Sequence, residues 1–336
     1  MITRNVGRVC RVLIRAYPIA LFVLVLLFRH VGERWWPLTV ALYLPRAVFG
    51  LPLVVAVLLA WRWRRSAPRL WIPIVLAALI VLGPLMGLEL SLPRRVHEER
   101  SIRVMTWNMW FGRRGVSAIL DEIDADHPDV VALQAGSREL VSAFRTHFAG
   151  WQLSESGEFL LISRYPISET WKPPHLDDVD GSPASFRRFT IATPLGAIDL
   201  LSTHPYSARD GISGLRHLDR GARAWFAENA ELRRQQMAAV VEEAHKSVNK
   251  VVIVGDTNLP GQSQILGSLL GDGRYRDAFV EAGRGFGYTF PADRHPWMRI
   301  DRVFTGAGLR ATRVEVGGRN GSDHCPVIAT IEADAQ

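Results

Sequence analysis

The chain has 336 residues, enough for one large domain and an accessory segment, and 48% of them are hydrophobic. Its net charge of +7 is uneven, because residues 1–93 hold 11 of the 40 basic residues and only two of the 33 acidic ones. The other 29 basic and 31 acidic residues nearly cancel, so the C-terminal part lacks the bulk positive charge typical of nucleic-acid-binding domains.

Three apolar runs come first in the chain, at residues 12–28, 38–61 and 70–88. Each is near the length of about 20 residues that spans a bilayer core. They predict a membrane anchor of about three transmembrane helices over residues 1–93, ahead of a separate domain over residues 94–336. A signal peptide is the rival interpretation of the first run, but no small-residue cleavage site separates it from the two later runs.

The second apolar run contains Pro45 and Arg46. An arginine inside a span costs roughly 2.5 to 3.5 kcal/mol on insertion scales. This span is therefore expected to be tilted, re-entrant or shortened to residues 47–61.

The placement of arginines predicts the orientation of the anchor. Residues 4–15 and residues 62–69 each contain four arginines, and such positive flanks stay cytoplasmic. With three spans the protein is a multi-pass protein of the cell membrane whose C-terminal domain is extracytoplasmic. Loss of the second span would reverse that orientation.

Short β-branched runs alternate with helical patterns from residue 101 onward. Strands are predicted at residues 102–106, 130–133, 159–162, 198–202, 251–254, 299–304 and 327–331, and helices at residues 116–126 and 228–247. This alternation predicts a layered α/β domain that delivers polar residues at strand ends.

Polar residues capable of holding a metal, a phosphate or a proton occur at these strand ends. They are Asn108, Gln134, His204, Asp256, Asn258, Asp301, Asp323 and His324. Taken singly, such residues are more often caps or turn residues. The series in this order instead indicates one shared site.

Each residue also has a purely structural interpretation. Asp256 and Asn258 could form an Asx turn after a buried strand. Asp301 could pair with a neighbouring arginine, Arg299 or Arg302. His204, which precedes a proline, could be a solvated turn residue.

The phrases around these residues resemble the successive signatures of the endonuclease/exonuclease/phosphatase superfamily. They are RVMTWN at 103–108, PDVVALQ at 128–134, ISRYPI at 162–167, STH at 202–204, VGDTN at 254–258, RIDR at 299–302 and SDH at 322–324. The superfamily includes pancreatic-type deoxyribonucleases, abasic-site endonucleases, inositol polyphosphate 5-phosphatases and neutral sphingomyelinases. The resemblance covers residues 102–331 and implies a four-layer α/β sandwich, two central mixed sheets flanked by helices, here preceded by the helical anchor.

The resemblance also implies a metal-dependent hydrolase. Asn108 and Asp323 would hold a divalent cation, and their oxygen atoms suit a hard ion such as magnesium, with manganese or calcium as alternatives. A cation and fixed hydrogen-bond donors stabilise the charge that builds on phosphate oxygens during in-line attack.

The remaining roles implied by the resemblance concern the phosphate. His324 would face the scissile phosphate, with its other ring nitrogen held by Asp301. Asp256 would orient or deprotonate the attacking water. Asn258 and His204 would donate hydrogen bonds to phosphate oxygens.

The sequence departs from the superfamily pattern at Ala135, where the superfamily places a glutamate that is the chief carboxylate ligand of the metal. A methyl group cannot coordinate a cation, and even indirect changes around a metal cost about 10- to 100-fold in affinity or activity. We therefore expect severely reduced activity.

Three explanations of Ala135 stay open: an introduced substitution, a natural pseudoenzyme, or replacement by another acid. Glu139, one helical turn further on, is a candidate for that acid, with a surface salt bridge as its rival role. An introduced substitution is favoured, because the other catalytic positions are intact.

Anchoring favours a membrane lipid or lipid headgroup as the substrate, because it gives the domain a high effective concentration of headgroups. An extracytoplasmic nuclease and a non-catalytic headgroup-binding pseudoenzyme are the alternatives. Residues 205–227 include Arg209, Trp225 and Phe226, which predict either a lid over anionic headgroups or a helix that packs on the core.

Overall fold

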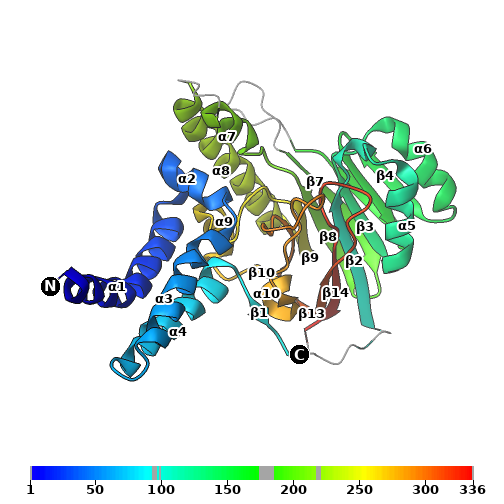
Figure 1. Cartoon of the computed structure of the whole chain (residues 1–336). Helices are drawn as coiled ribbons and strands as arrows, with labels where there is room; N and C mark the ends of the chain where they lie inside the picture. Colours follow the sequence, from blue (N-terminus) through cyan, green and yellow to red (C-terminus); the bar gives the residue numbers. More distant parts are fainter. Residues whose placement is uncertain (1, 93–96, 98–99, 174–184, 217–220, 335–336) are drawn as a thin grey trace. The chain divides into compact units, whose positions relative to one another are not determined.

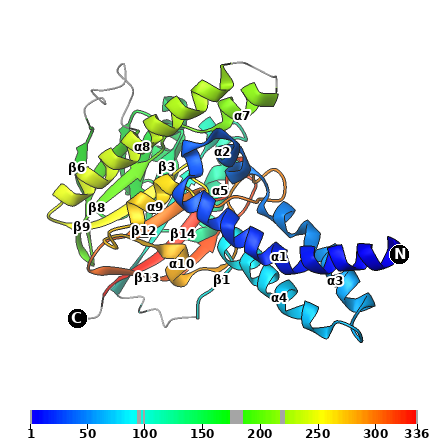
Figure 2. The same cartoon turned by 90° about the vertical axis from the view of Figure 1, so that its left-hand side faces the viewer.

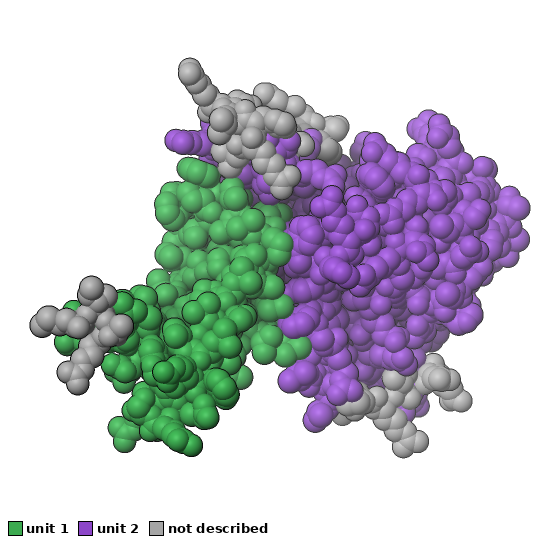
Figure 3. All heavy atoms as spheres, viewed as in Figure 1, with its two compact units in different colours: residues 1–88, 262–264 green, residues 89–261, 265–336 purple. Residues whose placement is uncertain are grey.

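The computed structural model describes residues 2–92, 97, 100–173, 185–216 and 221–334. The chain divides into two compact units (Figure 3). One comprises residues 1–88 with 262–264, and the other comprises residues 89–261 with 265–336. The first unit is helical, and the second is built from strands and helices.

The helical unit contains apolar helices long enough to cross a membrane. Its main helices are α1 (Ile2–His30), α2 (Trp36–Tyr43), α3 (Leu51–Arg62) and α4 (Trp71–Ile80). Two segments pass a length and composition test for spanning, Asn5–His30 and Pro68–Leu85. The segments Trp36–Tyr43 and Arg46–Arg62 form a third candidate only as a pair bent by 96°. The predicted interruption of the second apolar run is therefore present.

Arg46 lies at this interruption and is buried. Its Nη2 donates a hydrogen bond to the carbonyl oxygen of Leu42 at 2.6 Å, and its guanidinium lies 4.9 Å from the ring centre of Phe28 in α1. The preceding Pro45 has no N–H to continue the helix. The charge is thus held among groups of its own unit.

The second unit contains two six-stranded mixed sheets. The first has the order β13-β14-β2-β3-β5-β4 and the second the order β10-β12-β9-β8-β7-β6. Strands of the first sheet are β2 (Ser101–Asn108), β3 (Val130–Gln134), β4 (Gln152–Ser156), β5 (Phe159–Ser163), β13 (Leu309–Val316) and β14 (Val327–Ala333). Strands of the second are β6 (Ile167–Trp171), β7 (Phe186–Thr193), β8 (Gly196–Thr203), β9 (Lys250–Asp256), β10 (Arg276–Asp277) and β12 (Asp301–Thr305). A short pair, β1 (Glu89–Leu90) with β11 (Arg284–Gly285), stands apart from both.

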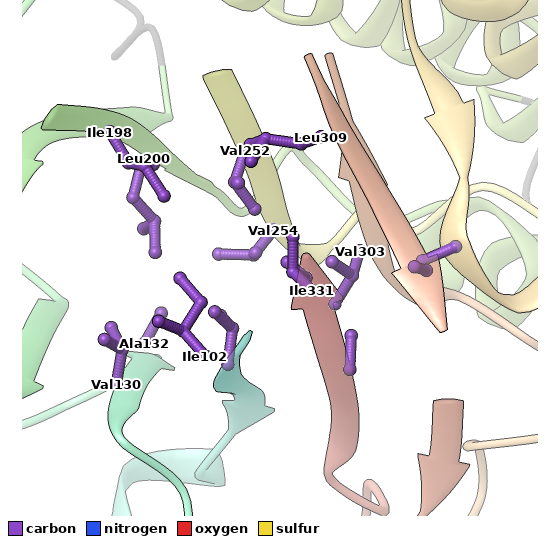
Figure 4. Packing of buried hydrophobic residues seen from close by; sticks show 14 of the residues in the cluster. Ile102, Val130, Ala132, Ile198, Leu200, Val252, Val254, Val303, Leu309 and Ile331 are labelled. Atoms are coloured by element: carbon purple, nitrogen blue, oxygen red, sulfur yellow. The ribbon is translucent and has the colours of Figure 1, made fainter. Parts of the chain in front are cut away.

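The two sheets pack face to face through aliphatic side chains. Figure 4 shows Ile198, Leu200 and Val252 of the second sheet pointing toward Ile102 and Ala132 of the first. Alternation along the strands sends the neighbouring residues to the outer faces. The main core of the unit therefore lies between the sheets.

Helices cover both outer faces (Figures 1 and 2). The helices of this unit are α5 (Val116–Asp126), α6 (Arg138–His147), α7 (Arg209–Arg216), α8 (Ala222–Lys246), α9 (Gln264–Leu270) and α10 (Ala278–Ala282). Ile119 of α5 and Phe144 of α6 pack on β2 and β3, whereas Val240 of α8 packs on β9. The predicted four-layer α/β sandwich is confirmed.

All seven predicted strands are present, and the predicted helix at residues 116–126 matches α5. The helix predicted at residues 228–247 begins earlier, at Ala222. The sequence did not predict strands β1, β4, β6, β7, β10, β11 and β13 or helices α6, α7, α9 and α10. Most of these elements are edge strands or short helices with mixed polar and apolar residues.

One edge of the paired sheets collects the ends of several strands. Each sheet contains one parallel pair, β2 with β3 and β8 with β9, so the C-terminal ends of each pair meet at the same edge. The antiparallel neighbours β5, β12 and β14 begin at that edge. Residues at the ends of β2, β3, β8 and β9 are thereby brought close to residues at the beginnings of β5, β12 and β14.

Candidate active site

Asp256 is the centre of a polar cluster at this edge. It is the last residue of β9 and is buried. Asn108, the last residue of β2, donates from its Nδ2 to Asp256 Oδ2 at 2.9 Å. The two sheets therefore meet through a hydrogen bond between the ends of their central strands.

Gly255 allows β8 and β9 to approach closely beside Asp256. Its φ is +137°, a backbone conformation that favours glycine. A Cβ at this position would lie 2.0 Å from the carbonyl oxygen of Thr203. The glycine in the VGDTN phrase is thus required by the backbone geometry that presents Asp256.

His324 lies on one side of Asp256 and is held by Asp301. His324 Nδ1 is 2.9 Å from Asp301 Oδ2 and 3.1 Å from Asp301 Oδ1, and its Nε2 is 3.7 Å from Asp256 Oδ2. Burial alone would lower the pKa of His324, but the carboxylates of Asp301 and Asp256 raise it to about 9. The imidazole is therefore held in its charged form, with Nε2 directed at Asp256.

His204 lies on the other side of Asp256 and is held by Glu158. His204 Nδ1 is 3.2 Å from Glu158 Oε2, while its Nε2 is 3.7 Å from Asp256 Oδ2 and 3.4 Å from Asn108 Nδ2. Burial acts to lower the pKa of His204, but the hydrogen bond and charge of Glu158 raise it overall. Two carboxylate-supported histidines thus converge on one oxygen of Asp256.

Asp323 completes the cluster from the loop before β14. Its Oδ1 lies 3.9 Å from His324 Nε2, and its Oδ2 lies 3.7 Å from the guanidinium of Arg209 in α7. Arg209 also stands 5.7 Å from the ring centre of Phe290, a ring that packs against His324. Arg209, which the sequence suggested for a lid, is the one cation of residues 205–227 that the described structure brings to the cluster.

Asn258 is close to the cluster but its side chain is engaged elsewhere. Its backbone N–H donates to Asp256 Oδ1 at 2.8 Å, which closes an Asx-type turn, and its φ is +50°. Its Nδ2 donates to the carbonyl oxygen of Pro205 at 2.9 Å. The Asx turn that the sequence offered as a structural interpretation is therefore present at Asp256 and Asn258. This turn lies within the polar cluster.

The structural alternatives for the other residues do not hold. Arg299 and Arg302 both pair with Asp277, at 2.7 Å, rather than with Asp301. His204 is not a solvated turn residue, because it contacts Glu158 and Asp256.

Ala135 follows β3 directly and is buried, with φ at +51°. Its carbonyl oxygen accepts from the N–H of Phe111, three residues after Asn108. Glu139, by contrast, is exposed in the first turn of α6. Ala135, where the resemblance implies a glutamate, therefore lies at the same sheet edge as Asn108, and Glu139 points to solvent.

Glu158 is a site residue that sequence reasoning missed. The antiparallel register that pairs Leu133 with Leu160 brings Glu158 alongside Ala135, and Gly136 N donates to the carbonyl oxygen of Glu158 at 2.9 Å. Glu158 precedes the predicted strand at residues 159–162. It lies outside the superfamily phrases, and only the antiparallel register with β3 reveals its position.

The residues at this edge include several groups of the kind that hold a cation, the oxygens of Asn108 and Asp323 among them. Ligand atoms of Asp256, Asp301 and His324 lie within 4.8 Å of one another, and all three residues are buried. Carboxylate oxygens are the ligands that hard divalent cations prefer. The donor chemistry at this edge fits such a cation, and Ala135 contributes no side-chain ligand to it.

No curated protein sequence matches this chain. Solved structures share its fold at low identity. An endonuclease/exonuclease/phosphatase protein from Beutenbergia cavernae is 19% identical, with a TM-score of 0.51, over 70% of this chain and 72% of that one. TDP2 from D. rerio, solved with a single-strand DNA product, is 16% identical, with a TM-score of 0.53, over 69% and 99% of the two chains. A mannosyl-6-phosphatase from Bacteroides thetaiotaomicron is 14% identical, with a TM-score of 0.52, over 68% and 99%.

The sequence identities to these structures are too low to assign a family. A family model does assign one. The model of the Endonuclease/Exonuclease/phosphatase family matches residues 105–324, which is most of the α/β unit and includes every residue of the cluster. The chain therefore belongs to the Endonuclease/Exonuclease/phosphatase family.

Proposed function

We propose that the protein is a metal-dependent phosphoesterase that acts at a membrane surface on a lipid or lipid headgroup. The observation that supports this most is the convergence of His204 and His324, each held by a carboxylate, on Asp256. Such an arrangement supplies one basic carboxylate between two cationic donors. In-line hydrolysis at phosphorus needs both kinds of group.

The proposed roles follow from these contacts. Asp256 orients or deprotonates the attacking water, because its Oδ2 is the oxygen on which both imidazoles converge. His324, protonated at neutral pH, donates from Nε2 toward a phosphate oxygen, and Asp301 fixes its tautomer. His204 donates in the same way from the other side, supported by Glu158. Asn258 spends one N–H of its side-chain amide on Pro205 and donates the other to a phosphate oxygen.

A divalent cation would be held by Asn108 and Asp323, with magnesium first and manganese or calcium as alternatives. Bound there, it would polarise a phosphate oxygen. Asn108 keeps its amide fixed by bonds to Asp256 and to the N–H of Trp110. Its Oδ1 therefore has one lone pair for a ligand bond.

Ala135 supports the proposal that this form of the protein is inactive or impaired. Glu158 lies alongside Ala135, but its carboxylate is engaged with His204. Glu158 is therefore not free to replace the glutamate as a metal ligand. This favours the interpretation that the metal-binding glutamate was substituted, over the interpretation that another acid takes its role.

The helical unit supports the choice of a membrane substrate. Two helices, or three if the bent pair counts as one span, are apolar and long enough to cross a bilayer. Of the solved structures that share this fold, one holds a single-strand DNA product and another is a mannosyl-6-phosphatase, so the shared fold does not select a substrate class. Tethering to a bilayer favours a lipid substrate, because it concentrates lipid headgroups around the domain.

The decisive experiment restores the carboxylate. The full chain and its Ala135→Glu variant, both in detergent, are assayed with magnesium on an aryl phosphodiester, phospholipids, nucleotides and DNA. The backbone at Ala135 already carries a Cβ at positive φ, so glutamate adds no new backbone strain there. We expect at least about 10-fold higher hydrolysis in the variant and a preference for phospholipid.

Two control variants test whether the gain in hydrolysis depends on the added charge and on His324. Ala135→Gln adds the same bulk without the charge and should stay near the original rate, and His324→Ala in the Ala135→Glu background should abolish turnover. Preference for DNA would favour the extracytoplasmic nuclease. An inactive Ala135→Glu protein on every substrate would favour the non-catalytic headgroup-binding pseudoenzyme.

Orientation is tested separately. We propose three spans with the arginine clusters of residues 4–15 and 62–69 in the cytoplasm, which places the α/β unit outside it. A C-terminal fusion to alkaline phosphatase, which folds only outside the cytoplasm, should be active. Activity of a cytoplasmic reporter at the same position would contradict three spans.

A further inference from the structure

A cavity of about 810 Å³ opens in the α/β unit, separate from the polar cluster. It is bounded by α10, by the residues that follow β11 and by β13, which lie beside one another in Figures 1 and 2. Cys325 lines this cavity, whereas the neighbouring His324 contacts Asp301. The cavity and the site thus lie on opposite sides of one loop.

The cavity wall combines arginines with apolar side chains. Arg284, Arg313 and Arg319 line it together with Phe279 and Val314. Glu315 also lines the cavity, and its carboxylate is paired with Arg313 at 2.6 Å. Arg284 and Arg319 are exposed and form no ion pair within the described part of the chain. Two guanidinium groups are therefore available for an anion beside an apolar surface.

The cavity is close in sequence to a candidate membrane span. Ser91 and Leu92 line the cavity, and Leu92 comes seven residues after Leu85, the end of a candidate span. Seven extended residues reach at most about 25 Å. Strand β1 is also paired with β11, with Leu90 opposite Arg284. Leu90 and Leu92 are 73% and 81% exposed.

We propose that this cavity binds the headgroup of an acidic phospholipid from the membrane that holds the helical unit. Arg284 and Arg319 contact the phosphate, in the manner of guanidinium groups that bind anions in pairs. Phe279 and Val314 pack against the glycerol and upper acyl carbons. The proposal rests on the proposed anchoring but not on the proposed hydrolysis.

The test is binding of short-chain lipids to the full chain. The protein in detergent is titrated with dioctanoyl phosphatidylglycerol, dioctanoyl phosphatidylcholine or inorganic phosphate, and bound adducts are counted by native mass spectrometry. We expect saturable binding of phosphatidylglycerol and at least tenfold weaker binding of the other two. The double variant Arg284→Gln/Arg319→Gln should lose at least tenfold in phosphatidylglycerol affinity.

A matched control separates this site from general surface charge. Arg138→Gln/Arg145→Gln removes two exposed arginines of α6 that do not line the cavity, and it should bind phosphatidylglycerol like the parent. Ala282→Trp fills the cavity without changing charge and should also weaken binding, which covers the case in which the double variant does not fold.

Three results would overturn the proposal. The first is equal phosphatidylglycerol binding by the parent and both cavity variants, which would place the lipid elsewhere, including in the polar cluster around Asp256. The second is equal binding of phosphatidylcholine. The third is equally tight binding of inorganic phosphate, which would make the cavity a site for a soluble anion. None of these readouts depends on turnover, so failure here leaves the proposed hydrolysis untouched.

Discussion

Asp301 holds Nδ1 of His324 at 2.9 Å and, with Asp256, stabilises the charged form of the imidazole. The folded pKa of about 9 lies above the ordinary histidine value of about 6.5. The pair therefore stabilises the fold below pH 6.5, and this contribution is lost as the pH rises through 9.

Asp301→Asn should lower the pKa of His324 and weaken this pH dependence, with the charge of Asp256 still acting on the ring. Histidine ring resonances of the full chain in a metal chelator report the pKa, and thermal unfolding between pH 6 and 10 reports stability. Asp293→Asn, at an exposed position, should leave both unchanged. An unaltered His324 titration in Asp301→Asn would show that Asp301 is not its main partner.

Glu158→Gln should lower the pKa of His204, because the charge and hydrogen bond of Glu158 raise it. The same ring resonances report the change. In the Ala135→Glu background the variant should also lose activity at the upper end of the pH range, where His204 would no longer be protonated. Glu155→Gln on the same hairpin is the control, since Glu155 contacts Arg138 and not a histidine. Equal effects of the two substitutions would assign Glu158 a structural role alone.

Gly255→Ala should destabilise the α/β unit strongly, because its Cβ would overlap the carbonyl oxygen of Thr203. Gly196→Ala separates overlap from backbone strain, since Gly196 also has positive φ, at +97°, but has open space around it. We expect about 1–2 kcal/mol for Gly196→Ala from strain alone and a clearly larger loss for Gly255→Ala, measured by denaturant unfolding. Similar losses at the two positions would argue against the close approach of β8 and β9.

Asp277→Asn should cost about 3–5 kcal/mol in stability, because it leaves the buried guanidinium of Arg302 without its carboxylate. Asp277 also pairs with Arg299 and caps α10 by accepting from the N–H groups of Phe279 and Val280. The melting temperature should fall on the order of 10 °C. Asp272→Asn, at an exposed site, should change it little. A small change in Asp277→Asn would mean that Arg302 finds another partner.

The central strands were predictable from sequence because they are buried on both faces. Val130, Val131 and Leu133, for example, form an apolar run that no helix pattern explains. The edge strands were missed because their exposed faces carry polar residues, as in β4 and β6. Their pairing depends on neighbours distant in the chain, which local periodicity does not contain.

The residues of the candidate site were predictable because superfamily phrases surround them, and all of them lie at the same sheet edge. The contacts among them were not predictable. The bond from Asn258 to Pro205 and the hold of Glu158 on His204 depend on side-chain directions. The pairing of Arg302 with Asp277 rather than with Asp301 likewise depends on the three-dimensional fold.

The position of β14 has a consequence for folding. This strand lies inside its sheet, hydrogen-bonded to β2, the first long strand, and the Ser322 hydroxyl beside it bonds to the carbonyl oxygen of Asn108. Asn108 and His324 are far apart in the sequence, so they come together only when β2 and β14 pair. The polar cluster therefore depends on a long-range strand pairing, a kind of contact that forms slowly because a long loop must close first.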